Sequence, residues 1–202
     1  MIPKRIVCFG ASTIYGRVDP EGGGFTARLR AWHEGNARSN AVFSLGIEGQ
    51  RTSALLKRFS LEVPPRNPGL VLINTGLNDT RREGSESAPW SVPLGEFRKN
   101  LSDLLQNAKA LCEVAVIGPF PIDDTRTRPI RIEPVWYLLS DAAEINAATR
   151  DICAKLEVPF LDLFAKWNGK PKPELLYSDG LHCNSAGHAW LFEEAKTFIA
   201  SR

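Results

Sequence analysis

Short runs of apolar and β-branched residues alternate along the chain with longer amphipathic stretches. The short runs predict β-strands at residues 5–9, 41–45, 69–75, 114–117 and 159–163. The amphipathic stretches predict helices at residues 24–34, 52–61, 94–111, 140–156 and 186–200. Strands and helices that alternate in this way form βαβ units around a parallel sheet, with helices on both faces. The pattern therefore predicts a three-layer α/β/α fold with a five-stranded parallel sheet.

Length and composition indicate a single unit. The chain has 202 residues, of which 43% are hydrophobic, and this is enough for one compact core. We expect one domain that spans residues 1–202. The formal net charge of +2 is too small to favour a nucleic-acid partner, which needs a concentrated basic face.

The amino terminus and the cysteines bear on location. The first five residues lead directly into the first predicted strand, without the separate apolar segment and small-residue cleavage site of a secretory signal. We therefore expect a cytoplasmic protein with no membrane span. The cysteines are widely spaced and form no Cys-x-x-Cys pair, which indicates buried, reduced thiols: Cys8, Cys112, Cys153 and Cys183.

Polar residues follow several of the predicted strands. Ser12 comes after the first strand, Gly46 after the second, Asn78 after the third, and Asp179 with His182 after the fifth. Ligands of open α/β sheets bind at the carboxyl ends of the strands, above all where the strand order reverses. In a flavodoxin-like order the first and third strands flank that crevice, so Ser12 and Asn78 would face each other across it.

Serine, aspartate and histidine together form a nucleophilic site. A serine hydroxyl is a weak nucleophile until an imidazole takes its proton, and the imidazole needs an acid to fix its tautomer. Because only two residues separate Asp179 from His182, a turn brings both side chains to one side. The alternative is that Ser12 is an ordinary turn serine and Asp179 a helix N-cap, the commoner fate of either residue alone.

Four segments resemble the conserved blocks of the SGNH hydrolases, also called GDSL-like lipases and esterases. They read Phe-Gly-Ala-Ser at residues 9–12, Ser-Leu-Gly at 44–46, Gly-Leu-Asn-Asp at 76–79 and Asp-Gly-Leu-His at 179–182. The resemblance spans the chain. It implies a serine hydrolase that cleaves small-molecule carboxylic esters through an acyl-enzyme, with thioesters or acetylated sugars as further targets, and that needs no cofactor.

The resemblance also implies a role for each residue. Ser12 would be the nucleophile, and its backbone amide would donate to the oxyanion. The Gly46 amide and the Asn78 side chain would complete this oxyanion hole, and Asp179 with His182 would complete the catalytic triad. Asp79, next to Asn78, is expected to cap backbone amides in its loop and not to contact substrate.

Two positions depart from the family pattern. Ala11 stands where the family name implies aspartate, and Ser44 stands where asparagine often precedes the glycine. Ala11 cannot supply the carboxylate hydrogen bonds that would brace the turn of Ser12. These departures leave open a second hypothesis, a catalytically inactive flavodoxin-like module that binds a small anion at the backbone amides of residues 10–16.

A metal-dependent hydrolase is a third hypothesis, because His182, Cys183 and His188 lie close together in the sequence. We expect no metal, since a helix that begins near residue 186 gives His188 a different phase from His182, and no hydrolytic zinc motif is present. His188 is expected to pack on the last helix or to form hydrogen bonds within it. His33, at a helix end, is expected at the surface.

Two long loops at residues 81–93 and 119–134 are expected to determine specificity. An apolar wall for an acyl or alcohol group would come from four aromatic residues in and beside them: Trp90, Phe120, Trp136 and Tyr137. The second loop also carries Arg126, Arg128 and Arg131. These arginines either contact a polar substrate or form an exposed mixed-charge segment with Asp123 and Asp124.

Overall fold

The computed structural model describes residues 2–130 and 134–202. Its main sheet has five strands, all parallel, in the order β2-β1-β3-β5-β7. The strands are β1(Arg5–Gly10), β2(Ala41–Gly46), β3(Leu70–Asn74), β5(Glu113–Ile117) and β7(Phe160–Leu161). The predicted α/β/α fold with a flavodoxin-like strand order is therefore confirmed.

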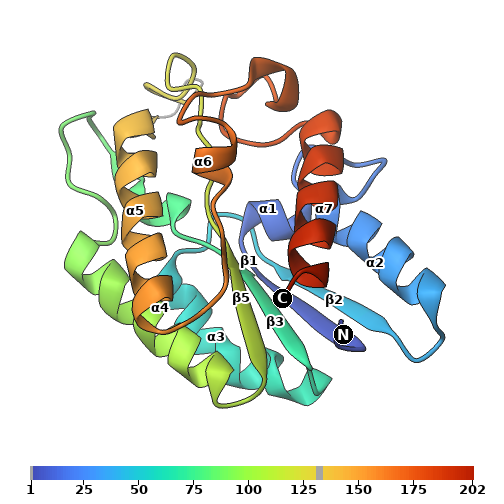
Figure 1. Ribbon diagram of the computed structural model, residues 1–202. Coiled ribbons are helices and arrows are strands. Elements are labelled where there is room, and N and C mark those ends of the chain that lie inside the picture. The colour runs from blue at the N-terminus through green and yellow to red at the C-terminus, as the bar shows by residue number, and fades with distance from the viewer. Residues whose placement is uncertain (1, 131–133) are drawn as a thin grey trace.

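Helices cover both faces of this sheet (Figure 1). One face is covered by α3(Thr52–Glu62), α4(Leu94–Lys109) and α5(Leu139–Lys155), and the other by α2(Gly24–Asn36) and α7(Ser185–Ala200). Alternate residues of each strand enter opposite cores. Val7 and Val71 pack with the first group of helices, and Ile6 and Leu70 with the second. This alternation explains why the strands are mostly apolar on both faces.

Short elements complete the chain between the long ones. They are α1(Ser12–Tyr15), α6(Leu163–Lys166), and the 3₁₀ turns η1(Pro64–Arg66), η2(Leu77–Thr80) and η3(Pro173–Leu175). The last strand is shorter than the predicted range 159–163, because Asp162 caps α6 by accepting a hydrogen bond from the amide of Ala165.

The two long loops are joined to each other. β4(Arg82–Glu83) in the first pairs antiparallel with β6(Val135–Trp136), which follows the second, and the amide of Gly84 donates to the carbonyl of Pro134 at 2.8 Å. Sequence patterns did not predict this second sheet, because two-residue strands are too short to show a period. The loops therefore support each other instead of extending separately into solvent.

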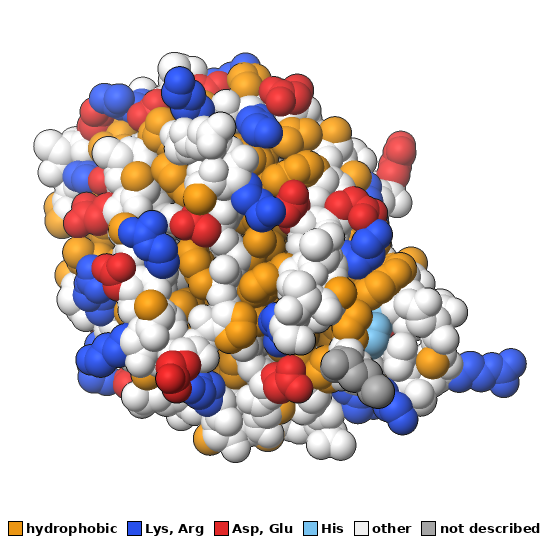
Figure 2. Space-filling view, in the orientation of Figure 1, with side chains coloured by type: hydrophobic (Ala, Val, Ile, Leu, Met, Phe, Trp, Pro, Cys, Tyr) orange, Lys and Arg blue, Asp and Glu red, His pale blue; other side chains and the backbone are white. Residues whose placement is uncertain are grey.

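Every cysteine is a free thiol, and all except the half-exposed Cys112 are buried, as predicted. The expectation for His33 is wrong, since its helix continues to Asn36 and the His33 side chain is buried, with Nε2 at 3.1 Å from the carbonyl oxygen of Lys4. None of the helices in the described ranges is long and apolar enough to cross a membrane. Figure 2 shows basic and acidic side chains interspersed on one face of the molecule.

Candidate active site

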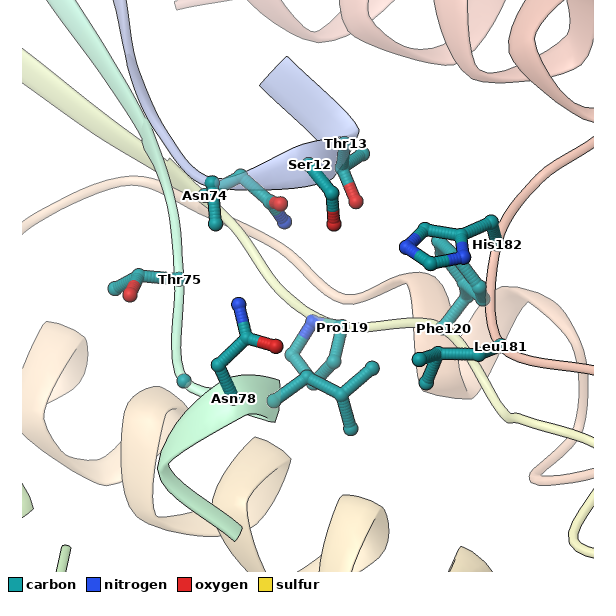
Figure 3. A pocket seen from close by; sticks show the side chains of 12 residues that line it. Ser12, Thr13, Asn74, Thr75, Asn78, Pro119, Phe120, Leu181 and His182 are labelled. Carbon is teal, nitrogen blue, oxygen red and sulfur yellow. The ribbon is translucent and has the colours of Figure 1, made fainter. Parts of the chain in front are cut away.

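A pocket lies where β1 and β3 end, at the reversal of the strand order. It is lined from four parts of the chain by Ala11, Ser12, Thr13, Asn74, Thr75, Gly76, Leu77, Asn78, Pro119, Phe120, Leu181 and His182. Figure 3 shows Ser12, Asn78 and His182 around this hollow. The structure thus brings Ser12 and His182 to the same pocket, although they are 170 positions apart in the sequence.

Ser12 is the first residue of α1, directly after β1. Its hydroxyl has no hydrogen-bond partner among the described residues, so it is available to a substrate or to a base. Close backbone packing sets the position of this turn. A Cβ atom on Gly10 would lie 2.1 Å from the carbonyl oxygen of Asn74, so only glycine allows β1 and β3 to approach here.

Gly46 packs against the same short helix. A Cβ atom at Gly46 would lie 2.2 Å from the backbone nitrogen of Tyr15, which is on α1 with Ser12. Gly46 itself is not among the residues that line the pocket. The structure therefore places Gly46 beside the helix that carries Ser12. Of the three residues expected to form the oxyanion hole, Gly46 is the one that does not line the pocket.

Asp179 and His182 form a tight local pair. Nδ1 of His182 lies 2.8 Å from Oδ2 of Asp179, and Oδ1 of Asp179 accepts from the amides of Leu181 and His182 at 2.9 and 3.0 Å. The turn between them needs Gly180, whose φ is +72° and whose Cβ would lie 2.6 Å from the carbonyl oxygen of Asp123. With Nδ1 bonded to the carboxylate, Nε2 is left to face other groups.

The Asp179 carboxylate is held in its ionised form. Burial alone would raise the pKa of Asp179, but the hydrogen bond and charge of His182, together with the amides of His182 and Leu181, lower it to about 2. An ionised, fixed carboxylate keeps the proton of the imidazole on Nδ1. This leaves Nε2 with a free lone pair, which is the form that a general base requires.

The side-chain amide of Asn78 is fixed at both ends. Its Nδ2 donates to the carbonyl of Gln50 at 3.0 Å, and its Oδ1 accepts from the hydroxyl of Tyr137 at 3.2 Å. Because Nδ2 carries two hydrogens, one N–H is left for another acceptor. Neither contact was expected, since Gln50 and Tyr137 lie 28 and 59 residues from Asn78 and belong to different loops.

Asp79 does not line the pocket. It is fully buried, and its carboxylate accepts from the backbone amide of Thr52, at the start of α3, and from the Thr52 hydroxyl. Asp79 therefore caps a backbone amide, as expected, but the amide belongs to a helix 27 residues away and not to its own loop. Burial raises the pKa of Asp79 to about 6, against the opposing effect of the Thr52 hydrogen bonds.

Other side chains form hydrogen bonds near Ala11 and at Ser44, the two positions that depart from the family pattern. Near Ala11, the Arg58 guanidinium donates to the carbonyl oxygens of Gly10 and Leu45 at 2.8 and 2.7 Å. The hydroxyl of Ser44 donates to the carbonyl of Ile14 in α1 at 2.9 Å. Both groups hold the strand ends against the turn that carries the serine.

The aromatic residues do not form one wall. Phe120 lines the pocket, and Tyr137 contacts Asn78. The expectation is wrong for Trp90, which lines a separate hollow with Arg82 and Glu144. Trp136 lies in β6 and is not among the pocket residues.

The arginines of the second loop pair with neighbouring acids. Arg126 pairs with Asp123 at 3.0 Å, and Arg128 pairs with Glu86 and with Asp124. This matches the exposed mixed-charge alternative. Arg131 lies outside the described residues.

His188 is engaged by groups outside its own helix, contrary to the expectation of bonding within it. Its Nδ1 accepts from the amide of Phe25 at 3.3 Å, and its Nε2 donates to the carbonyl of Arg17 at 3.1 Å. Burial lowers the pKa of His188, which favours this neutral form. In the described ranges no group of three or more histidine, cysteine or acidic side chains is placed to hold a metal ion.

The match to a family of lipases and acylhydrolases shows that the chain, with its pocket at the ends of β1 and β3, is a hydrolase of the esterase and lipase type. Residues 8–190 match the GDSL-like lipase/acylhydrolase family, and the chain belongs to this family. It is 23% identical over 178 residues to the isoamyl acetate-hydrolyzing esterase of Schizosaccharomyces pombe, an alignment that covers 88% of this chain and 68% of the relative.

Solved structures share the fold. The lipase/acylhydrolase from Enterococcus faecalis superposes with a TM-score of 0.77 and 25% identity over 98% of this chain and 96% of its own. An acetylxylan esterase from Geobacillus stearothermophilus superposes with a TM-score of 0.73 and 21% identity, over 97% of this chain and 94% of its own. At 21% identity, the likeness to the acetylxylan esterase shows a shared fold alone.

Proposed function

We propose that the protein hydrolyses carboxylic esters through an acyl-enzyme on Ser12. One observation carries the proposal: Ser12, whose hydroxyl has no hydrogen-bond partner among the described residues, lines the same pocket as His182, whose Nδ1 lies 2.8 Å from the carboxylate of Asp179. A base with a fixed tautomer beside an available hydroxyl is the arrangement that nucleophilic catalysis needs.

In the first step Nε2 of His182 takes the proton of the Ser12 hydroxyl as Oγ attacks the ester carbonyl carbon. The C=O π electrons move to the carbonyl oxygen, which becomes an oxyanion. The tetrahedral intermediate then collapses, the bond to the alcohol oxygen breaks, and the imidazolium gives its proton to the leaving alcohol. Asp179 stabilises the imidazolium and stays ionised throughout.

The oxyanion would be met by the backbone amides of Ser12 and Gly46 and by Nδ2 of Asn78. Asn78 is the best supported of these donors, because it lines the pocket and its amide is held by two hydrogen bonds. Donors that are fixed before the reaction stabilise developing charge without reorganisation. In the second step a water molecule attacks the acyl-enzyme by the same route and releases the acid and the Ser12 hydroxyl.

We propose small-molecule esters with a short acyl group as the substrate class. The name of one similar protein supports this, since it is an isoamyl acetate-hydrolyzing esterase. Apolar side chains of Leu77, Phe120 and Leu181 line the pocket beside the polar groups, which suits a small acyl group better than a charged one.

The test compares p-nitrophenyl acetate, butyrate and octanoate as substrates for the wild type and Ser12→Ala, with and without a chelator. We expect the highest kcat/KM on acetate and loss of turnover in Ser12→Ala. Retained activity in Ser12→Ala that disappears with chelator would favour a metal-dependent hydrolase. Absence of activity from both proteins, together with measurable binding of a small anion, would favour the non-catalytic module.

A further inference from the structure

Tyr137 reaches the candidate oxyanion donor from a distant part of the chain. It lies between β6 and α5, 59 residues after Asn78, and its hydroxyl donates to Oδ1 of Asn78 at 3.2 Å. In the proposed mechanism this hydroxyl contacts no reacting atom and has no step of its own. We propose that Tyr137 is a positioning residue for catalysis, whose hydroxyl orients the Asn78 amide toward the oxyanion; this inference rests on the proposed function.

An asparagine amide has two nearly isosteric orientations that exchange oxygen and nitrogen. Only the orientation with nitrogen toward the pocket can donate to an oxyanion, because the other presents a lone pair to negative charge. The carbonyl of Gln50 can only accept, so it selects the orientation with Nδ2 toward it, and the Tyr137 hydroxyl then holds the other end of the amide by donating to Oδ1. In Figure 3 the amide nitrogen of Asn78 is on the side of Ser12 and the oxygen on the side of Pro119.

The backbone of Tyr137 is itself fixed. Its amide donates to the carbonyl of Thr127 at 3.0 Å, and its carbonyl accepts from the Thr127 hydroxyl at 2.6 Å. Thr127 is fully buried, so neither bond competes with bulk water. The hydroxyl of Tyr137 therefore extends from a rigid point and not from a free loop.

The ring of Tyr137 belongs to a small apolar cluster beside the pocket. Its buried members are Ile122, Val135, Tyr137, Ala142 and Leu181, and Leu77 packs against them. Leu77 precedes Asn78 and Leu181 precedes His182, so one cluster supports the segments of both groups. Tyr137→Phe removes only the hydroxyl and leaves this packing in place. Its effect therefore measures the hydrogen bond to Asn78 and not the packing of the ring.

The test is a double-mutant cycle on p-nitrophenyl acetate with Tyr137→Phe and Asn78→Ala. If the hydroxyl acts through Asn78, Tyr137→Phe lowers kcat by about 3- to 10-fold, the effect of one lost hydrogen bond, with KM nearly unchanged. In the Asn78→Ala background the same change has no further effect, because the amide that it orients is gone. Tyr177→Phe, which removes the hydroxyl of a partly exposed tyrosine, is the matched control with wild-type kcat expected.

Two results would overturn the inference. One is wild-type kcat in Tyr137→Phe; the other is an equal loss in both backgrounds, which would mean that the hydroxyl acts independently of Asn78. Thermal unfolding of each variant shows whether a lost fold accounts for lost turnover. Ser12→Ala, measured in parallel, separates the two proposals: full activity in that variant removes the proposed function, whereas inactivity there with a silent Tyr137→Phe removes only the role of Tyr137.

Discussion

Arg58 and Gly10 are joined by a hydrogen bond of 2.8 Å from the guanidinium Nη2 to the backbone carbonyl, 48 residues apart in the sequence. The same nitrogen donates to Leu45, Nη1 pairs with Glu62 at 2.6 Å, and the guanidinium lies 4.4 Å from the centroid of the Phe9 ring. One side chain therefore ties the carboxyl ends of β1 and β2 together, immediately before Ser12 and Gly46.

Arg58→Lys tests this brace. A lysine ammonium keeps the charge but lacks the planar fork that meets several acceptors and lies over a ring. We expect the free energy of unfolding to fall by about 1–3 kcal/mol, as one or two buried hydrogen bonds are lost, and kcat to fall with it. Urea unfolding and ester kinetics measure both effects.

Arg98→Lys, at an exposed position of α4, is the matched control, and it should change the free energy of unfolding by no more than about 0.5 kcal/mol. Equal stability and kcat in Arg58→Lys and the wild type would show that the strand ends keep their positions without the guanidinium.

Asn78→Ala tests the proposed oxyanion donor. Removal of one preorganised donor from an oxyanion site costs about 10²–10³ in rate, so kcat should fall by that factor while the fold persists. Circular dichroism and steady-state kinetics check the two parts. Asn107→Ala, at an exposed position of α4, should retain full activity. Wild-type turnover in Asn78→Ala would remove this residue from the oxyanion hole.

Asp79→Asn tests the cost of burying a carboxylate. The pKa of Asp79 is about 6 in the folded protein and about 3.8 as its ordinary value, so between these pH values the folded state binds more protons than the unfolded state. The Asp79 contribution to the free energy of unfolding therefore falls as pH rises through this window and levels off above pH 6. Asparagine keeps an oxygen acceptor for Thr52 and has no such titration.

The free energy of unfolding of Asp79→Asn minus that of the wild type should therefore rise by roughly 2–3 kcal/mol from pH 4 to pH 7. Urea unfolding at four pH values across this range measures the difference. Parallel stability profiles for the two proteins would contradict a raised pKa at this position.

The elements that the sequence predicted well are those with many residues in one pattern. Four strands and all five long helices lie close to their predicted ranges, because their apolar spacing repeats over several residues. The contact between Asp179 and His182 could also be expected, because two intervening residues limit where the side chains lie. Such features depend on local chain geometry.

Long-range polar contacts could not be predicted in the same way. Tyr137 was expected as part of an apolar wall, and nothing in its neighbourhood in the sequence indicates Asn78 as a partner. The burial of His33 could not be predicted for the same reason, because its hydrogen bond to the carbonyl of Lys4 depends on how α2 packs on the sheet. A polar residue in a helix or loop carries no period that identifies its partner, so only the folded chain can show it.

Asp179→Asn tests the orientation of His182 separately from its presence. An asparagine can place its amide near Nδ1 and donate a hydrogen bond, which would make Nδ1 an acceptor and move the imidazole proton to Nε2. Nε2 could then no longer accept the proton of Ser12, so kcat should fall by about 10³–10⁴ with little change in KM. Steady-state kinetics measure this loss, and Asp103→Asn on the surface of α4 is the control, with wild-type kinetics expected. A variant that retains wild-type kcat would show that His182 does not need the carboxylate, and the proposed triad would then be reduced to a pair.

Asp179→Asn should also change how stability depends on pH. Because the pKa of Asp179 is lowered to about 2, this carboxylate contributes stability above pH 4 that is lost as pH falls toward 2. Asp179→Asn should lack that part of the acid unfolding profile.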